Sequence, residues 1–189
     1  MRKLITLLLA LTMLVSINAG SAGESAQASD SHILVVVFSC TGNTRPLAEY
    51  AAELLNADLY EIEAAQPYTE ADLAYYTGGR CDQEQDDPDV RPAIANPLES
   101  IEQYDTIVIG HPIWHGQAPR IISTFLESYD FSGKTMTTFC TSMSSGLGSS
   151  ALNLYTLVSD SVTWLESRRF PAGASKEDIA AWLNEIEIH

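Results

Sequence analysis

The chain has 189 residues, of which 10 are basic and 25 acidic, and its formal net charge at pH 7 is -15. This charge argues against nucleic acids and anionic membrane surfaces as partners, because both would repel it. The three cysteines, Cys40, Cys81 and Cys140, include no Cys-x-x-Cys pair, which argues against a zinc site and thioredoxin-type chemistry. One disulfide is conceivable in an oxidising compartment, but the sequence does not select a pair.

Residues 1–22 have the layout of a secretory signal peptide. Two basic residues precede an apolar run at 4–17, and small residues follow it. The run is shorter than the ~20 residues that a membrane-spanning helix needs. We therefore expect export with cleavage near Ala19 or Ala22, and an uncleaved anchor is the alternative.

Residues 23–31 are expected to form a flexible polar lead, and residues 32–189 are enough for one well-buried domain. Apolar strand-like runs alternate with helical patterns, which predicts an α/β fold with a parallel sheet covered on both sides by helices. In chain order, the expected elements are strands at 33–38 and 57–63, the second at a sheet edge, with a helix at 44–56 between them, then strands at 106–110, 135–140 and 162–165 and helices at 119–128, 149–158 and 176–187.

The segment 66–103 has the weakest pattern. A short helix through Ala71 to Tyr76 would end at Gly78 and Gly79. The acidic run from Asp82 to Asp89 lacks the glycine and terminal glutamate of a calcium loop, so we expect a solvated acidic loop there.

The turn between the first strand and the first helix predicts a phosphate site. It contains hydroxyl and amide side chains and a glycine that permits positive φ, and the helix dipole favours an anion there. It has neither the lysine of a nucleoside triphosphate loop nor the glycine spacing of a dinucleotide fold, so a phosphate monoester is the expected ligand. An ordinary strand-to-helix turn is the alternative. The residues are Ser39, Cys40, Thr41, Gly42, Asn43 and Thr44.

Two further loops follow strands whose carboxyl ends meet the same edge of such a sheet. The second loop includes Pro112, Ile113, Trp114, His115 and Gly116; its exposed-looking tryptophan would make a stacking platform for a planar heterocycle, unless it packs into the core. The third loop could hydrogen-bond the polar edge of a ring, or could be a flexible turn. Its candidate residues are Thr141, Ser142, Met143, Gly146 and Gly148.

A planar ring with one phosphate describes flavin mononucleotide (FMN), and at this point the chain resembles the flavodoxin family. The segments that carry the resemblance are 39–44, 110–114 and 139–142. The resemblance implies a three-layer sandwich with a five-stranded parallel sheet of order 2-1-3-4-5 and FMN at its switch point. It also implies that 39–44 hold the phosphate and that the second and third loops face the ring.

The chain departs from its relatives at two positions. His115 stands where many relatives of this subtype have a second tryptophan, and the third loop lacks the tyrosine that often stacks on the outer flavin face. His115 could adjust a potential or a proton, or could be only a loop residue. One face of the ring would then be open to a substrate.

Three functions remain. The leading one is an exported FMN-binding electron carrier, whose acidic surface steers it to basic redox partners and lowers the potential of the flavin's last electron. The second is an FMN-dependent NAD(P)H:quinone or small-acceptor oxidoreductase. The third is a non-redox binding module that retains the fold without the flavin.

Overall fold

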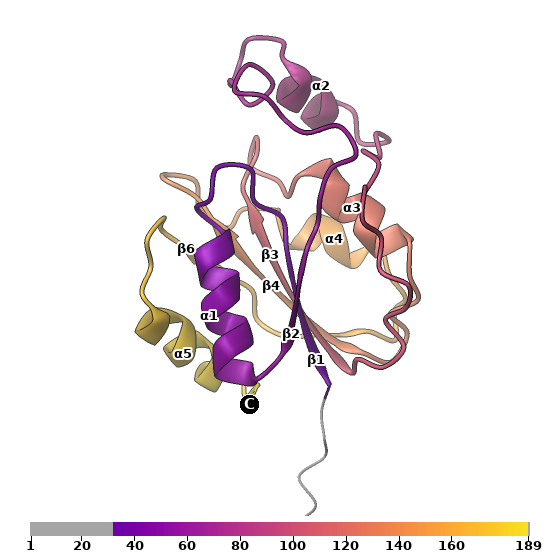
Figure 1. Cartoon of the computed structure of the whole chain (residues 1–189), viewed down its shortest axis with the longest axis vertical. Coiled ribbons are helices and arrows are strands. Elements are labelled where there is room, and N and C mark those ends of the chain that lie inside the picture. Colours follow the sequence, from indigo (N-terminus) through magenta and orange to yellow (C-terminus); the bar gives the residue numbers. More distant parts are fainter. Residues whose placement is uncertain (1–31, 189) are drawn as a thin grey trace, which may run out of the picture.

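The computed structural model describes residues 32–188, so the expected signal peptide and flexible lead lie outside the described residues. A parallel sheet of order β2-β1-β3-β4-β5 forms the centre, and β6 pairs with β4 on the same side as β5. Figure 1 shows helices on both sides of this sheet. The strands are β1 Ile33–Val37, β2 Asp58–Glu61, β3 Thr106–Pro112, β4 Thr135–Thr141, β5 Thr163–Trp164 and β6 Arg168–Phe170. The helices are α1 Arg45–Leu55, α2 Arg80–Asp86, α3 Arg120–Glu127, α4 Leu152–Tyr155 and α5 Lys176–Glu185.

The α/β fold and the strand order agree with the sequence-based expectation, but the fifth strand position is divided. β5 pairs with the start of β4, and β6 pairs with its end, from Phe139 to Thr141. The apolar run at 162–165 therefore supplies only half of that position. The helix expected at 149–158 is also shorter, and α4 keeps one regular turn.

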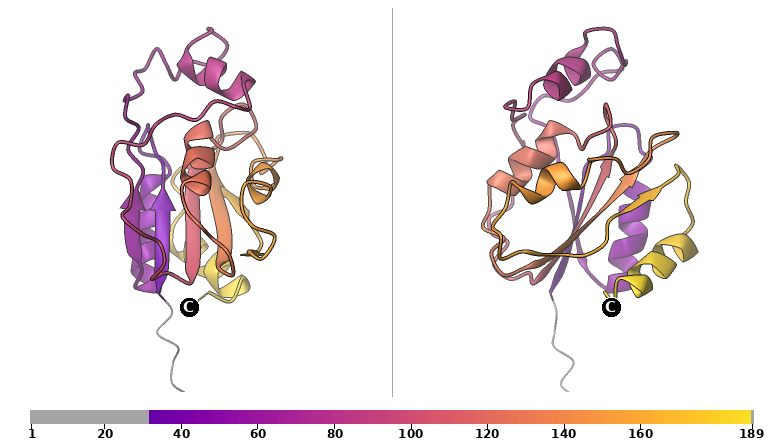
Figure 2. Two further views of the ribbon diagram at one scale, coloured as in Figure 1. Left: turned by 90° about the vertical axis from the view of Figure 1, so that its right-hand side faces the viewer. Right: turned by 180° about the vertical axis from the view of Figure 1, so that it is seen from behind.

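Two apolar cores lie on opposite faces of the sheet. The fully buried run of β1 sends alternate side chains to each, which explains why its sequence is apolar without interruption. On one face, Phe125 of α3 and Leu154 of α4 pack against the sheet. On the other, Leu47 of α1 and Trp182 of α5 do so. Figure 2 shows these helix pairs on either side of the strands.

The chain between β2 and β3 includes a segment, residues 65–93, that we call the cap segment. An antiparallel bridge between Ala64 and Ile94 closes its base. The segment carries α2 and rises beyond the carboxyl ends of the strands (Figures 1 and 2). The helix expected at 71–76 is wrong: that stretch is a series of turns, and the helix begins at Arg80.

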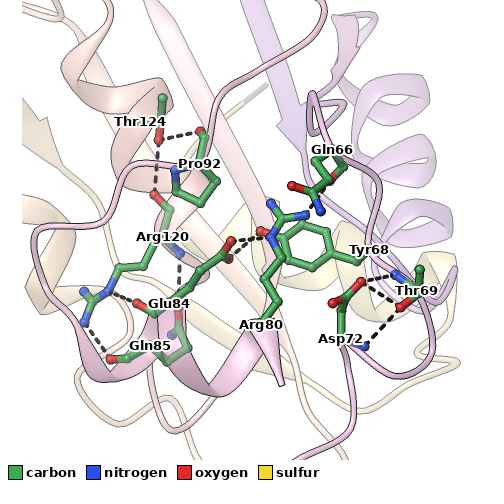
Figure 3. Close-up of polar contacts among 10 residues, drawn as sticks. All are labelled: Gln66, Tyr68, Thr69, Asp72, Arg80, Glu84, Gln85, Pro92, Arg120 and Thr124. Atoms are coloured by element: carbon green, nitrogen blue, oxygen red, sulfur yellow. Dashed lines mark hydrogen bonds and ion pairs between the residues drawn. The ribbon is translucent and has the colours of Figure 1, made fainter. Parts of the chain in front are cut away.

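The expected solvated acidic loop is wrong for Asp82 and Glu84, which lie in α2 and are buried, while the other acidic residues of the run are exposed. Each has partners that offset the cost of burying a charge. Glu84 accepts hydrogen bonds from Nε of Arg80 at 2.6 Å and from the hydroxyl of Tyr68 at 2.6 Å. The Arg80 guanidinium also lies 4.0 Å from the centre of the Tyr68 ring. Figure 3 shows this network.

The end of α2 is tied to the second loop. The side-chain amide of Gln85, which is buried, donates to the carbonyl groups of Trp114 at 3.0 Å and Ala118 at 3.2 Å. Its oxygen accepts the backbone N–H of Arg120 at 3.2 Å. The Arg120 guanidinium returns two bonds to the carbonyls of Glu84 and Gln85 (Figure 3). The cap segment is thus anchored to α3 and to the loop after β3.

Candidate functional site

The turn between β1 and α1, residues 39–44, borders a cavity at the carboxyl ends of the strands. Five of its six residues line the cavity, while Gly42 does not. Gly42 has φ +76°, a left-handed conformation that glycine adopts without steric cost. Its role is therefore to shape the turn rather than to contact the contents of the cavity.

The N-terminus of α1 has no side-chain cap. The N-cap hydroxyl, on the buried Thr44, instead lies 2.8 Å from the hydroxyl of Thr141 in the third loop. The nearest substitute is Oγ of Ser39, which accepts the N–H of Thr44 at a long 3.3 Å. The first turn of α1 therefore keeps backbone donors for an anion, in the direction that the helix dipole favours.

The second loop turns back at His115 and Gly116. Both have left-handed backbones, with φ +48° and +77°. Trp114 and Gln117 exchange both backbone hydrogen bonds at 2.9 Å across them. Positive φ at both central residues is the requirement of a type I′ turn, and histidine is among the residues that tolerate it. The turn places His115 against the cavity, which Pro112 and Ile113 also border.

Trp114 is not the exposed platform that its loop suggested. Its side chain is buried, with 5% of the residue exposed, and belongs to the α3-side core. The ring makes edge contacts with Phe38 at 5.6 Å and Tyr68 at 5.1 Å between centroids. Trp114 still borders the cavity, but most of its ring surface is used by the core.

The third loop follows β4. Thr141, Ser142 and Met143 line the cavity with the two serines that follow, whereas Gly146 and Gly148 do not. Arg169 of β6 supports the loop by donating to the carbonyl of Ser142 at 2.6 Å. Met143 is 92% exposed, and none of the residues by which this loop lines the cavity is aromatic.

The cavity has a volume of about 560 Å³, within the range of about 300–1,000 Å³ typical of small-molecule sites. Its lining contains no Asp, Glu, Lys or Arg, although the chain has 25 acidic residues. The lining combines hydroxyl side chains with apolar and aromatic surface, and the uncapped start of α1 borders it, which suits a phosphate with a planar ring.

The cap segment provides a wall of this cavity that the sequence did not predict. Leu73, Tyr75 and Tyr76 line it, and the rings of the two tyrosines lie beside that of His115. The adjacent tyrosines before Gly78 were the available signal. Their position could not be inferred, because the bonds that fold the cap segment over the cavity come from distant residues.

Asp82 holds the backbone of this wall. Its carboxylate accepts N–H groups from Tyr76 at 3.1 Å, Thr77 at 2.7 Å and Gly78 at 2.8 Å. Nε2 of His115 lies 2.8 Å from its Oδ1, although the ring N–H is not aligned for a regular hydrogen bond. Burial alone would raise the pKa of Asp82, but these N–H groups and His115 lower it below its ordinary value.

Three structural features are absent from residues 32–188. All three cysteines are free, so no disulfide forms. No group of three or more potential ligands is placed to hold a metal ion in this part of the chain. No helix there is long and apolar enough to cross a membrane.

The comparisons with known proteins agree with this geometry. The family model described as Flavodoxin matches residues 32–186. A candidate flavoprotein from Bacteroides eggerthii DSM 20697 is 42% identical, with a TM-score of 0.78 over 85% of this chain and 100% of that chain. One from Bacteroides uniformis ATCC 8492 is 41% identical, with a TM-score of 0.77 over 82% and 98%.

A more distant structure shares the fold. A flavoprotein from Lactobacillus acidophilus NCFM, described in complex with FMN, is 22% identical, with a TM-score of 0.60 over 80% of this chain and 98% of that chain. Among curated proteins, none matches the chain.

Proposed function

This chain belongs to the flavodoxin family, and from that premise we propose that it binds FMN and transfers electrons outside the cytoplasm. The observation that carries the proposal is the cavity, which joins the uncapped start of α1 to a space of the size of a planar cofactor. Its lining has no acidic side chain that would repel a phosphate.

The turn at 39–44 would hold the phosphate. The hydroxyls of Ser39 and Thr41 and the amide of Asn43 are available at the cavity, with the backbone donors of the turn beside them. The contact between Thr44 and Thr141 would join this end of the site to the third loop. A neutral donor set suits a monoester because hydrogen bonds to a charged acceptor are strong in a partly buried site.

The second and third loops would surround the ring. Pro112 and Ile113 would lie along one side, and Thr141 and Ser142 would offer hydrogen bonds to its polar edge. Bound FMN would supply the electron chemistry, while the protein binds and orients it. The net charge of -15 disfavours added negative charge on the ring, so we expect a lower potential for the last electron than in free FMN.

The same acidic surface would attract basic redox proteins and repel nucleic acids and anionic membranes. Location outside the cytoplasm rests on the composition of residues 1–22 alone. An N-terminal truncation series, followed by fractionation of cells that express the full chain, tests it. Retention of the full chain in the cytoplasm would contradict it.

A second candidate function is an FMN-dependent NAD(P)H:quinone or small-acceptor oxidoreductase. The exposure of Met143 favours it, because the third loop leaves one side of the cavity open to a small molecule. In this function FMN would occupy the cavity, and NAD(P)H and the acceptor would bind in turn at its open side.

The experiment is an absorption titration of the purified protein with FMN, followed by anaerobic addition of NAD(P)H. Binding with slow bleaching supports the carrier, and rapid bleaching by NAD(P)H alone supports the oxidoreductase. Absence of FMN binding would overturn both and leave a non-redox binding module. A potentiometric titration then tests whether the last electron is harder to add than in free FMN.

A further inference from the structure

We propose that Tyr76, with Tyr75 beside it, is the aromatic wall against which the planar ring of the cofactor packs. The proposal rests on FMN binding as the function of the cavity. It assigns to the cap segment the stacking role that the sequence suggested for Trp114, whose ring is instead buried in the core.

Tyr76 carries a ring that the fold does not bury. The residue is 88% exposed, so its ring contributes almost nothing to the packing of the fold. Its backbone is nevertheless left-handed, with φ +58°. That conformation is unfavourable for a bulky residue, and such outliers gather at ligand sites. A large ring that the fold does not bury is therefore free to contact a ligand in the cavity.

The rings of Tyr75 and Tyr76 both lie beside the second loop. Both tyrosines line the cavity. Their ring centroids lie 5.1 Å and 5.2 Å from that of His115, on the second loop. The hydroxyl of Tyr75 donates to the carbonyl of Ile113 at 3.2 Å, which fixes one ring against the loop expected to border the flavin. Tyr75, Tyr76 and His115 thus form a cluster of rings at the cavity.

Hydrogen bonds to one carboxylate hold the backbone beneath this cluster in place. The carboxylate of Asp82 binds the backbone N–H groups of Tyr76, Thr77 and Gly78 and contacts His115. The wall is therefore built before a ligand arrives, which lowers the entropy cost of binding. An offset or edge-on aromatic contact with a planar ring is then favourable, and its loss should weaken binding about tenfold.

The test replaces Tyr76 in the full chain by glycine and by phenylalanine. Tyr76→Gly removes the ring and also the steric cost of the left-handed backbone, so the melting temperature should stay the same or rise. FMN affinity should fall about tenfold, and the bound flavin should fluoresce more strongly. Tyr76→Phe keeps the ring, and it should retain both the affinity and the quenching of the unchanged protein.

Asn56→Gly is the matched control, because Asn56 also has a left-handed backbone, with φ +48°, at the end of α1 away from the cavity. It should leave FMN affinity and fluorescence unchanged. Unaltered affinity and fluorescence in Tyr76→Gly would overturn the aromatic wall while leaving FMN binding intact. Failure of the unchanged protein to bind FMN would instead overturn the proposed function and the wall with it.

Discussion

The turn at 39–44 and the cap segment border the same cavity but are built in different ways. The turn joins β1 directly to α1, and neighbouring residues determine its conformation, with Gly42 supplying the positive φ. The cap segment depends on contacts such as those of Gln85 with Trp114 and of Asp82 with His115, which join residues far apart in the chain. A site can therefore combine a locally encoded anchor with a wall that only tertiary contacts position.

The largest expected effect concerns a buried histidine in β3. His111 is fully buried on β3, and burial lowers the pKa of its ring to about 4. Its Nδ1–H donates to the carbonyl of Pro112 at 3.0 Å, while Nε2 is buried without a partner among residues 32–188. In the unfolded chain this ring takes up a proton near its ordinary pKa of about 6.5.

Because the folded pKa is depressed, the unfolded state binds more protons between these two pH values, and stability is lost as pH falls from about 6.5 to about 4. The loss reaches about 3 kcal/mol at the lower end. Urea unfolding at several pH values measures it. His111→Gln should flatten this part of the pH profile, and an unchanged slope would show that His111 is not its source. If the turn at 39–44 and the cap segment both depend on the stability of β3, hydrogen exchange should rise in both as the pH falls.

The next effect should separate the two regions. Asp82→Ala removes the acceptor of three backbone N–H groups in the cap segment. Hydrogen exchange at residues 76–78 should accelerate by roughly 100-fold, since local opening no longer breaks charge-assisted bonds. Exchange at 39–44 should not change.

Asp72→Asn is the control for that substitution. Asp72 also accepts a backbone N–H, from Thr69 at 2.8 Å, but it is half-buried and does not line the cavity. Its replacement should affect residues 69–72 only. Equal acceleration at 39–44 in Asp82→Ala would contradict the independence of the two regions.

A smaller effect is expected from the turn itself. In Gly42→Ala the added Cβ meets no atom within 4 Å, so the cost comes only from φ +76°. That cost is about 1–2 kcal/mol. If the turn changes its conformation to avoid this cost, it should bind FMN about tenfold less tightly. Gly133→Ala, with φ +74° and equal space but away from the cavity, should leave the affinity unchanged. Calorimetric titration distinguishes the two variants.

The smallest effect concerns the support of the cap segment. Tyr68→Phe removes the hydroxyl that donates to Glu84 at 2.6 Å but keeps the ring beside Arg80 and Trp114. The lost bond should cost about 1 kcal/mol, measured by urea unfolding. Tyr155→Phe is the control, because its ring packs against Trp164 while its hydroxyl makes no hydrogen bond within residues 32–188. An equal or larger loss in the control would show that hydroxyl removal alone is the cause.

Most elements of the fold could be predicted from the sequence. The apolar runs of β1, β3 and β4 and the periodic pattern of α5 indicated their type, because each pattern reflects burial on two faces or on one. The division of the fifth strand position into β5 and β6 could not be predicted. It depends on pairing with β4 across a break at 165–167, and two or three residues are too few for a pattern.

For the site, local sequence was enough to identify the turn at 39–44, whose conformation follows from glycine, hydroxyl side chains and a helix start within six residues. Tertiary structure alone determined which aromatic rings face the cavity. Trp114 is buried because Phe38 and Tyr68 from other segments enclose it, and Tyr76 is exposed at the cavity because Asp82 fixes its backbone. A side chain's exposure depends on what packs against it, and that is set by residues that the chain brings together only when it folds.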